Sequence, residues 1–326
     1  MSLTVSNLTK SYGNTIVVDH LSFSMNEPGV YALLGTNGAG KTTSIRMILG
    51  MLARDGGEVT WNNAPLTRDT CNIGYLAEER GLYPKYPLMD QLLYFARLRG
   101  VTGQAAKDRI RYLAQRLEVE EYLYPARKTG GNTKRGSLFG KGSGKSGKTM
   151  RTDQLSKGNQ QKIQLMAALL SDPELIVLDE PLSGLDPVNA DLFRGIIREE
   201  IQKGKYLIMS SHQMETVEEF CTDITILKRS KTILQGNLNE IKKSRGRVKL
   251  HLKVETDIAE LIREQGIGIV SEKENEYNLN VTGQEQANSL LGELMCRKIP
   301  VITFDLREPS LHEIFVEKAG EPDDER

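Results

Sequence analysis

The sequence predicts an α/β protein built on a parallel sheet, followed by a smaller α+β domain. Three observations support this prediction. A glycine-rich loop at 35–43 follows an apolar run at 30–34 and precedes an apolar-periodic helix at 45–52, which is the order of a βα unit. The continuous apolar run at 175–178 is typical of a buried parallel strand. Beyond residue 236 the composition changes, and short strand and helix patterns alternate.

Composition limits the possible functions. The chain has 326 residues, enough for a large core and a smaller domain, and its 43 basic side chains equal its 43 acidic ones. A balanced charge argues against a protein whose main role is nucleic-acid binding. Eight basic side chains and no acidic one fall within residues 127–151, so the rest of the chain is acidic by eight charges.

Cysteine spacing and hydropathy exclude further classes. Cys71, Cys221 and Cys296 are far apart and form no C-x-x-C pair, so they indicate neither a disulfide framework nor a zinc site. No apolar stretch approaches the roughly 18 residues needed to span a bilayer. The amino terminus lacks a basic region followed by an apolar one. We therefore expect a soluble, unexported chain in a reducing compartment.

The chain begins with short strand patterns at 3–5, 16–18 and 21–25. The turn at 11–14 separates the first two strands and carries Tyr12, which precedes the glycine loop. An aromatic ring there is placed to stack on a nucleotide base, although a tyrosine in a turn is more often a packing residue. Both roles remain open for Tyr12 at this point.

The glycine loop is the predicted phosphate site. Gly35, Gly38 and Gly40 allow the backbone to turn its N–H groups inward, beside the positive end of the following helix dipole. Such a cradle binds an anionic polyphosphate, with Lys41 reaching the β- and γ-phosphates and the Thr42 hydroxyl on Mg²⁺. The predicted nucleotide-binding loop consists of Gly35, Thr36, Asn37, Gly38, Ala39, Gly40, Lys41, Thr42 and Thr43.

Two strands and then two helices are predicted after the glycine loop and its helix. They cover 56–61, 71–76, 89–99 and 104–117. The adjacent carboxylates Glu78 and Glu79 follow the second of these strands. They are placed to contact a metal ion or a water near the phosphates, although such a pair is often only a solvated surface.

Residues 127–151 interrupt this pattern. Glycine and serine alternate with lysine and arginine, so the segment cannot bury enough surface to offset its chain entropy and is predicted to be a flexible insertion. A second G-x-x-x-x-G-K-T match at 142–149 has no strand before it and no apolar helix after it, so we reject it as a nucleotide site. The insertion is either a solvated loop or a contact for anionic lipid headgroups.

Polar residues then begin a helix and end the central strand. Ser156 and Gly158 precede an amphipathic helix that runs to Leu170, and they suit either an N-cap or donors to an anion. Asp179 and Glu180 follow the apolar strand, at the edge where open α/β sheets bind ligands. Asp179 suits Mg²⁺ coordination through water, and Glu180 suits a base or polariser of an attacking water.

A histidine follows the next predicted strand. A turn at 183–187 leads into a helix at 188–202, and strand 206–210 is followed by His212. A lone histidine is normally structural. One that leaves a core strand at its carboxyl end also faces the crevice that holds Glu180, so both roles remain open.

The last part of the chain predicts a separate small domain. The β-α-β-β-α-β order of its patterns is typical of a ferredoxin-like domain at 245–320, after a larger nucleotide-binding region at 1–236 and a linker at 237–244. Residues 321–326 are expected to be a disordered tail. The domain contains no constellation of chemical groups, and His251 and His312 are expected to be surface or packing residues.

Residues 1–240 resemble the nucleotide-binding ATPase subunit of an ABC transporter. The segment at 155–161 is similar to the signature motif peculiar to that family, which makes the resemblance specific. The resemblance implies a P-loop NTPase fold, with a RecA-like core and antiparallel β and α-helical subdomains. It also implies a base-stacking role for Tyr12, Walker A for 35–43, Walker B for Asp179 and Glu180, a D-loop containing Asp186, and a switch role for His212.

In this family two such domains sandwich ATP, so one chain supplies two half-sites. The resemblance implies that the signature residues close on the γ-phosphate of the opposite subunit; they are Ser156, Lys157, Gly158, Asn159 and Gln160. Two departures are closest to the sodium-exporter-like, or ABC-2-type, exporter branch: Glu78 replaces the usual glutamine of the Q-loop, and Lys157 replaces a glycine. The carboxy-terminal domain resembles the accessory domain of the same branch.

The resemblance implies ATP hydrolysis coupled to export through a separate transmembrane permease. Lys41, Glu180 and His212 would be catalytic, and Thr42, Asp179 and Glu78 would hold Mg²⁺.

We expect a homodimer, or a pair with a related ATPase subunit, at the cytoplasmic face of the cell membrane. No nucleic acid is expected, and the membrane contact runs through the permease, with the basic insertion as a further contact. The alternatives are a soluble relative acting on ribosomes or DNA, and a regulatory ATPase; the cargo stays open.

Overall fold

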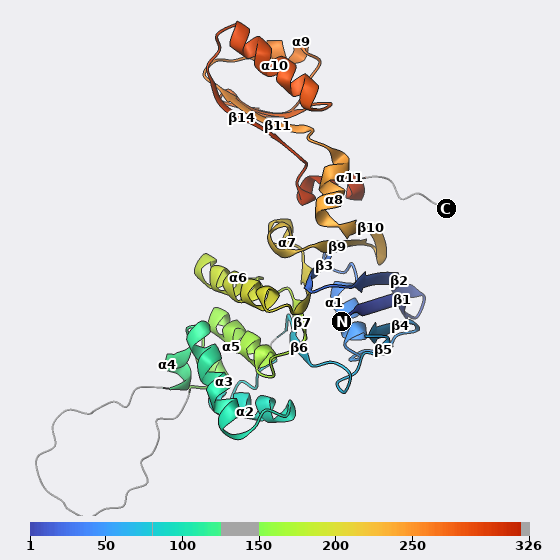
Figure 1. Cartoon of the computed structure of the whole chain (residues 1–326), viewed down its shortest axis with the longest axis vertical. Coiled ribbons are helices and arrows are strands. Elements are labelled where there is room, and N and C mark those ends of the chain that lie inside the picture. Colours follow the sequence, from blue (N-terminus) through green and yellow to red (C-terminus); the bar gives the residue numbers. More distant parts are fainter. Residues whose placement is uncertain (80, 125–149, 321–326) are drawn as a thin grey trace, which may run out of the picture. The chain divides into compact units, whose positions relative to one another are not determined.

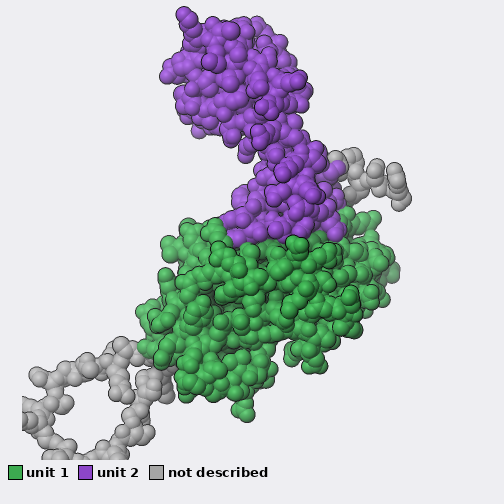
Figure 2. All heavy atoms as spheres, in the orientation of Figure 1, with its two compact units in different colours: residues 1–212, 229–232 green, residues 213–228, 233–326 purple. Residues whose placement is uncertain are grey.

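A computed structural model describes residues 1–79, 81–124 and 150–320. The described chain forms two compact units, which Figure 2 distinguishes by colour. Unit 1 contains residues 1–212 and 229–232, and unit 2 contains residues 213–228 and the chain from 233 onward. The predicted domain boundary at 236 stays a prediction. Apart from residues 150 and 151, the basic insertion lies outside the described residues, as do the decoy loop at 142–149 and the tail at 321–326.

An antiparallel sheet opens unit 1. Its strands are β1 (Leu3–Tyr12), β2 (Thr15–Met25), β4 (Gly56–Trp61) and β5 (Ala64–Pro65), in the spatial order β2-β1-β4-β5. The predicted short strands at 3–5, 16–18 and 21–25 are therefore parts of one long hairpin. Register shifts between β1 and β2 disturb the alternation of buried residues, which made the hairpin look like separate strands.

Four parallel strands form the centre of unit 1. They are β3 (Gly29–Gly35), β8 (Tyr206–Ser211), β7 (Leu175–Asp179) and β6 (Ile73–Leu76), and they neighbour one another in that order. Every residue of β3, β7 and β8 is buried, as continuous apolar runs predict. Because the strands are parallel, their carboxyl ends lie at one edge, with Asp179 paired to Ser210 and Leu34 to Ser211.

Helices occupy the remainder of unit 1 (Figure 1). They are α1 (Lys41–Ile48), α2 (Leu88–Leu98), α3 (Gly103–Arg116), α4 (Glu120–Leu123), the 3₁₀ turn η1 (Thr152–Gln154), α5 (Lys157–Leu169) and α6 (Pro187–Gln202). The helices predicted from periodicity lie close to these bounds, except for α1. That helix begins four residues before the predicted start at Ile45, because its first turn is polar and carries no apolar period.

Unit 2 begins with elements that the sequence did not predict. They are α7 (Met214–Phe220), β9 (Asp223–Lys228), β10 (Lys231–Asn237, whose first two residues belong to unit 1) and α8 (Leu238–Arg245). Helices of seven or eight residues contain too few turns for a clear apolar period, which explains why α7 and α8 were missed.

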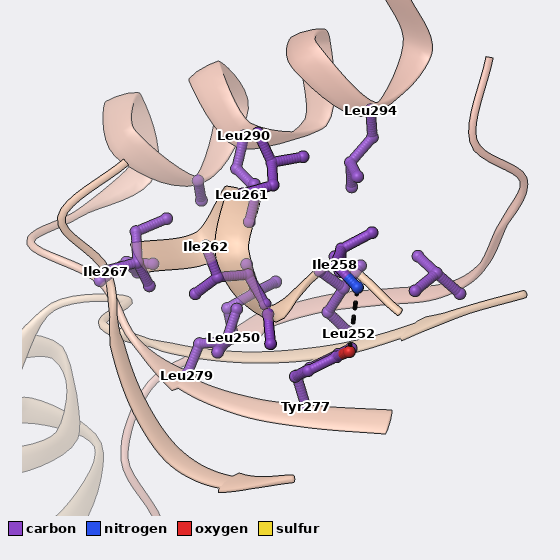
Figure 3. Close-up of a cluster of buried hydrophobic side chains, with 14 residues drawn as sticks. Leu250, Leu252, Ile258, Leu261, Ile262, Ile267, Tyr277, Leu279, Leu290 and Leu294 are labelled. Carbon is purple, nitrogen blue, oxygen red and sulfur yellow. Dashed lines mark hydrogen bonds between the residues drawn. The ribbon is translucent and has the colours of Figure 1, made fainter. Parts of the chain in front are cut away.

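The rest of unit 2 confirms the ferredoxin-like prediction. Its elements are β11 (Lys249–Val254), α9 (Ala259–Glu264), β12 (Gly268–Lys273), β13 (Glu276–Asn280), α10 (Gln284–Cys296), β14 (Val301–Arg307) and α11 (Leu311–Gly320). The antiparallel sheet has the order β12-β13-β11-β14. A cluster of 14 buried residues joins the sheet to α9 and α10, and in it the Tyr277 hydroxyl accepts the Ile258 N–H at 3.1 Å (Figure 3).

Leu252→Ala should loosen this cluster. Leu252 is fully buried on β11, so truncation leaves a cavity and costs about 2–5 kcal/mol of local stability. Hydrogen exchange of the full chain should show faster exchange at the β11 and β13 amides. Val270→Ala on β12, where the side chain is 60% exposed, is the matched control and should leave exchange unchanged. Equal protection in both variants would contradict the assigned core.

Candidate active site

The glycine loop is closely packed against the antiparallel sheet. A Cβ added to Gly40 would lie 2.5 Å from the carbonyl oxygen of Val17 on β2, and the backbone φ of Gly40 is +103°. Only glycine therefore fits without a backbone shift. Directly after it, Lys41 begins α1 and its ammonium donates to the carbonyl oxygens of Gly35 at 2.8 Å and Thr36 at 3.3 Å. The loop thus holds a buried positive charge that would compensate the negative charge of a bound polyphosphate.

Asp179 carries the features of a cation ligand. Its Oδ1 accepts from the hydroxyl of Thr42 at 3.3 Å and from that of Ser210 at 2.5 Å. Its Oδ2 is buried and has no hydrogen-bond partner among the described residues. Burial raises the pKa of this carboxyl, as does the nearby charge of Glu180, while the two hydroxyl donors lower it. An orphaned carboxylate oxygen beside a threonine hydroxyl fits Mg²⁺, which prefers oxygen ligands.

Glu180 lies between a lysine and a histidine side chain. It is 6% exposed, and its Oε1 lies 3.4 Å from the ammonium of Lys41. Its Oε2 lies 2.8 Å from Nδ1 of His212, which leaves the end of β8. The N–H of Glu180 donates to the Ser210 hydroxyl at 2.9 Å. The carboxylate is thereby fixed beside the glycine loop, with one lysine and one histidine as partners.

Ser210 was not predicted from the sequence, yet its hydroxyl joins both acids. It donates to Asp179 and accepts from the N–H of Glu180. The contact depends on the register of β8 against β7, where Ser210 pairs with Asp179. The available signal was a serine at the end of an otherwise apolar strand, at the edge where ligands bind.

Glu78 stands apart from the other expected metal ligands. It is exposed in the loop after β6, and no hydrogen bond between described residues joins it to Thr42 or Asp179. It lines a 150 Å³ pocket with Lys157, Glu180 and other residues of α5 and the loop after β7. No cluster of three or more His, Cys, Asp or Glu side chains suited to a metal occurs in the described parts of the chain. Of the three expected ligands, the structure therefore brings together Thr42 and Asp179.

The segment at 155–161 begins α5. The Ser156 hydroxyl oxygen caps the helix by accepting from the Asn159 N–H at 3.3 Å. The Asn159 amide in turn donates to the Tyr122 hydroxyl at 2.8 Å, and the Gln160 amide donates to the carbonyl oxygen of Leu155 at 3.0 Å. Within the described residues, no hydrogen bond joins this segment to the glycine loop of the same chain. Hydrogen bonds to the segment itself and to Tyr122 thus hold the start of α5.

Tyr12 and Asp186 lie at separate positions on the surface. Tyr12 is 54% exposed at the end of β1, and the ammonium of Lys10 lies 5.5 Å from its ring centroid. Asp186 caps α6, accepting from the N–H of Asn189 at 3.0 Å. That backbone N–H is the main reason why the pKa of Asp186 is lowered. An exposed ring suits base stacking, and the capped Asp186 fixes the loop between Glu180 and α6.

Comparison with known proteins decides the family. The sequence model of the family described as ABC transporter matches residues 18–183, just over half of the chain. The chain belongs to the ABC transporter ATP-binding family. A second model, described as the C-terminal domain of DrrA1-3-like ATP-binding proteins, matches residues 236–319. Proteins of this family bind ATP and hydrolyse it to power transport. This ABC ATPase therefore has the activity that its glycine loop and acids predict.

Relatives extend over the whole ABC ATPase. An uncharacterized ABC transporter ATP-binding protein, YhaQ of Bacillus subtilis, is 37% identical over 98% of both chains. The linearmycin resistance ATP-binding protein LnrL of the same organism is 27% identical, again over 98% of both chains. The Nod factor export ATP-binding protein I of Mesorhizobium japonicum is 32% identical over 71% of this chain and 62% of its own length.

Solved structures share the fold. One described as the ATP binding subunit of an ABC transporter has a TM-score of 0.62 and 25% identity, covering 75% of this chain and 93% of its own. The dimeric structure of MJ0796, a bacterial ABC transporter cassette, has a TM-score of 0.59 and 19% identity, covering 72% of this chain and 98% of its own. These likenesses confirm the predicted P-loop NTPase fold.

Gly40→Ala should destabilise the ABC ATPase more than Gly38→Ala. Both residues have a positive φ, but an added Cβ meets the Val17 carbonyl oxygen only at position 40, whereas nothing lies within 4 Å at position 38. We expect Gly40→Ala to lower the free energy of unfolding without nucleotide by about 1–3 kcal/mol beyond the effect of Gly38→Ala. Denaturant unfolding measures the difference. Equal losses would show that the loop is not packed against β2 as described.

Proposed function

We propose that two copies of this ABC ATPase hydrolyse Mg-ATP jointly and drive a transmembrane permease that exports a substrate. The observation that carries this proposal is Glu180, a buried carboxylate beside the phosphate loop that contacts Lys41 on one side and His212 on the other. Such a group can orient and polarise a water for attack on a γ-phosphate held in the loop. Phosphoryl transfer depends mainly on this kind of positioning and charge stabilisation.

Each side chain takes one step in the proposed reaction. The Lys41 ammonium exchanges the carbonyl oxygens of Gly35 and Thr36 for phosphate oxygens. Glu180 takes hydrogen bonds from the attacking water, and His212 steadies both Glu180 and the γ-phosphate. Thr42 and Asp179 would hold Mg²⁺, which neutralises charge on the phosphates when bound. Glu78, which also lines the pocket of Glu180, would reach the ion or its water shell.

The second half-site would come from another copy. By the resemblance of 155–161 to the family signature, Ser156, Lys157 and Gly158 would lie over the phosphates of the opposite subunit. The cap at Ser156 keeps the start of α5 fixed, and the side chains of Lys157 and Gln160 already line the pocket beside Glu180. Positively charged Lys157 suits a phosphate contact. Tyr12 would stack on the base, and Asp186 would lie at the subunit boundary.

An exposed aromatic surface supports the permease partner. Tyr83, Tyr86, Tyr94 and Leu98 are each at least half exposed in and before α2, close in sequence to Glu78. Contiguous exposed apolar side chains are typical of an interaction site. In the described parts of the chain no helix has the length and hydropathy to cross a bilayer. A separate transmembrane subunit would supply the pathway, and this ABC ATPase would bind it at the cytoplasmic face of the cell membrane.

Export is the direction that the relatives favour. The names of two of them refer to linearmycin resistance and to Nod factor export. Those substrates belong to those proteins, and the cargo here depends on the permease. The basic insertion at 127–151 would add a contact with anionic lipid headgroups.

Glu180→Gln should abolish hydrolysis while sparing ATP binding. The amide keeps the shape of the side chain but cannot accept a proton, so we expect the rate to fall by about 100-fold or more. ATP affinity should stay within about threefold of wild type. Light scattering should show an ATP-dependent dimer that persists because the bound ATP is not hydrolysed. Asp191→Asn, which changes a 75% exposed acid on α6, is the control and should hydrolyse ATP normally. Near wild-type hydrolysis by Glu180→Gln would overturn the proposal.

A further inference from the structure

The short helix α7 directly follows the switch histidine. His212 contacts Glu180 at 2.8 Å, and Gln213 alone separates His212 from α7. The boundary between the two compact units falls between His212 and Gln213, so α7 belongs to the unit that contains the carboxy-terminal part of the chain. A helix of seven residues is too short to be stable by itself. The position of α7 therefore depends on what packs against it.

The carboxy-terminal helix α11 packs against α7. The N–H of Leu311, the first residue of α11, donates to Oε1 of Glu218 on α7. The other oxygen of Glu218, Oε2, lies 3.5 Å from the ammonium of Lys242 on α8. Leu311 and Ile314 are fully buried, and so is Val217 on α7. Glu218 thus links α7 to both α8 and α11.

Ion pairs fasten α11 to elements that precede it in unit 2. Lys249 of β11 lies 3.8 Å from Glu313, and Arg245 of α8 pairs with Glu317. Ser310 caps the start of α11, because its N–H and hydroxyl both donate to the carboxylate of Glu313. Figure 1 shows α11 beside α8, away from α9 and α10. The last helix of the described chain therefore contacts α7 and α8, and none of its residues belongs to the buried cluster of the ferredoxin-like sheet.

We propose that Glu218 is a positioning residue for ATP hydrolysis, through which the carboxy-terminal domain controls His212. With the Leu311 contact in place, α7 is fixed and His212 stays on Glu180. Without the Leu311 contact, α7 and the adjoining His212 become more mobile, and His212 contacts Glu180 in a smaller fraction of the molecules. We expect ATP binding to be spared, because carbonyl oxygens of its own loop hold the Lys41 ammonium. This inference rests on the proposed role of His212.

Kinetics of full-length variants test the proposal. We expect Glu218→Ala to lower kcat by about fivefold or more, the usual range for coupling between sites, with KM for ATP within about twofold of wild type. Glu218→Gln can still accept from the Leu311 N–H and should retain most of kcat. Glu215→Ala, which removes an exposed acid from the same helix, is the matched control and should be fully active. In a His212→Ala background, Glu218→Ala should have no further effect, because both act on one contact.

A second pair of variants tests the hydrogen-bond donor, the Leu311 N–H, instead of the Glu218 acceptor. Proline is tolerated at the first position of a helix and has no N–H, so Leu311→Pro should reproduce the loss of kcat. Leu311→Ala removes the same side-chain packing but keeps the N–H, and it should be clearly more active than Leu311→Pro. This pair decides the matter if Glu218→Ala does not fold.

Three results would overturn the proposal: unchanged kcat in both Glu218→Ala and Leu311→Pro, a rise in KM without a fall in kcat, or an equal loss in the His212→Ala background. A His212→Ala variant that hydrolyses ATP normally would instead overturn the role given to His212 under the proposed function. The two failures are therefore distinguishable.

Discussion

The burial of Glu180 is the constraint on which the rest of the structure depends. A carboxylate that is 6% exposed is costly unless cationic or hydrogen-bonding partners are fixed beside it. Lys41 arrives from the loop after β3 and His212 from the end of β8, at 3.4 and 2.8 Å. The parallel order β3-β8-β7 is what brings these three chain ends to one edge. The sheet alone therefore brings these three side chains together, without a bound substrate.

The site also contains buried oxygen atoms that no described residue satisfies. Among the described residues, Oδ2 of Asp179 and Oε1 of Glu180 are buried without a hydrogen-bond partner, and Lys41 is the cation nearest to Glu180 Oε1. Nearly all buried polar groups in native structures are hydrogen-bonded, so each exception needs a specific explanation. A metal ion, a nucleotide and an ordered water would satisfy them. The proposed sharing of the nucleotide with a second copy would explain why, within the described residues, no hydrogen bond joins the capped start of α5 to its own phosphate loop.

Prediction from the sequence succeeded where one local pattern determines the structure. The apolar runs at 30–34, 175–178 and 206–210 are core strands, and Asp179 and Glu180 lie at the expected edge. Features that depend on register or on distant packing were missed. Ser210 matters only because β8 pairs with β7 in one register. Glu218 contacts Leu311 across 93 positions of the chain. Local patterns contain no information about such contacts.

A mixing experiment examines the shared nucleotide site most directly. Lys41→Ala removes the phosphate loop function, and Ser156→Arg blocks the signature, so each variant alone should be inactive. If two copies share each nucleotide, mixed pairs contain one intact loop facing one intact signature. Random pairing of a two-fold symmetric dimer then restores about a quarter of the wild-type hydrolysis rate. Absence of recovery at every mixing ratio, with both variants folded and able to pair, would contradict the shared site.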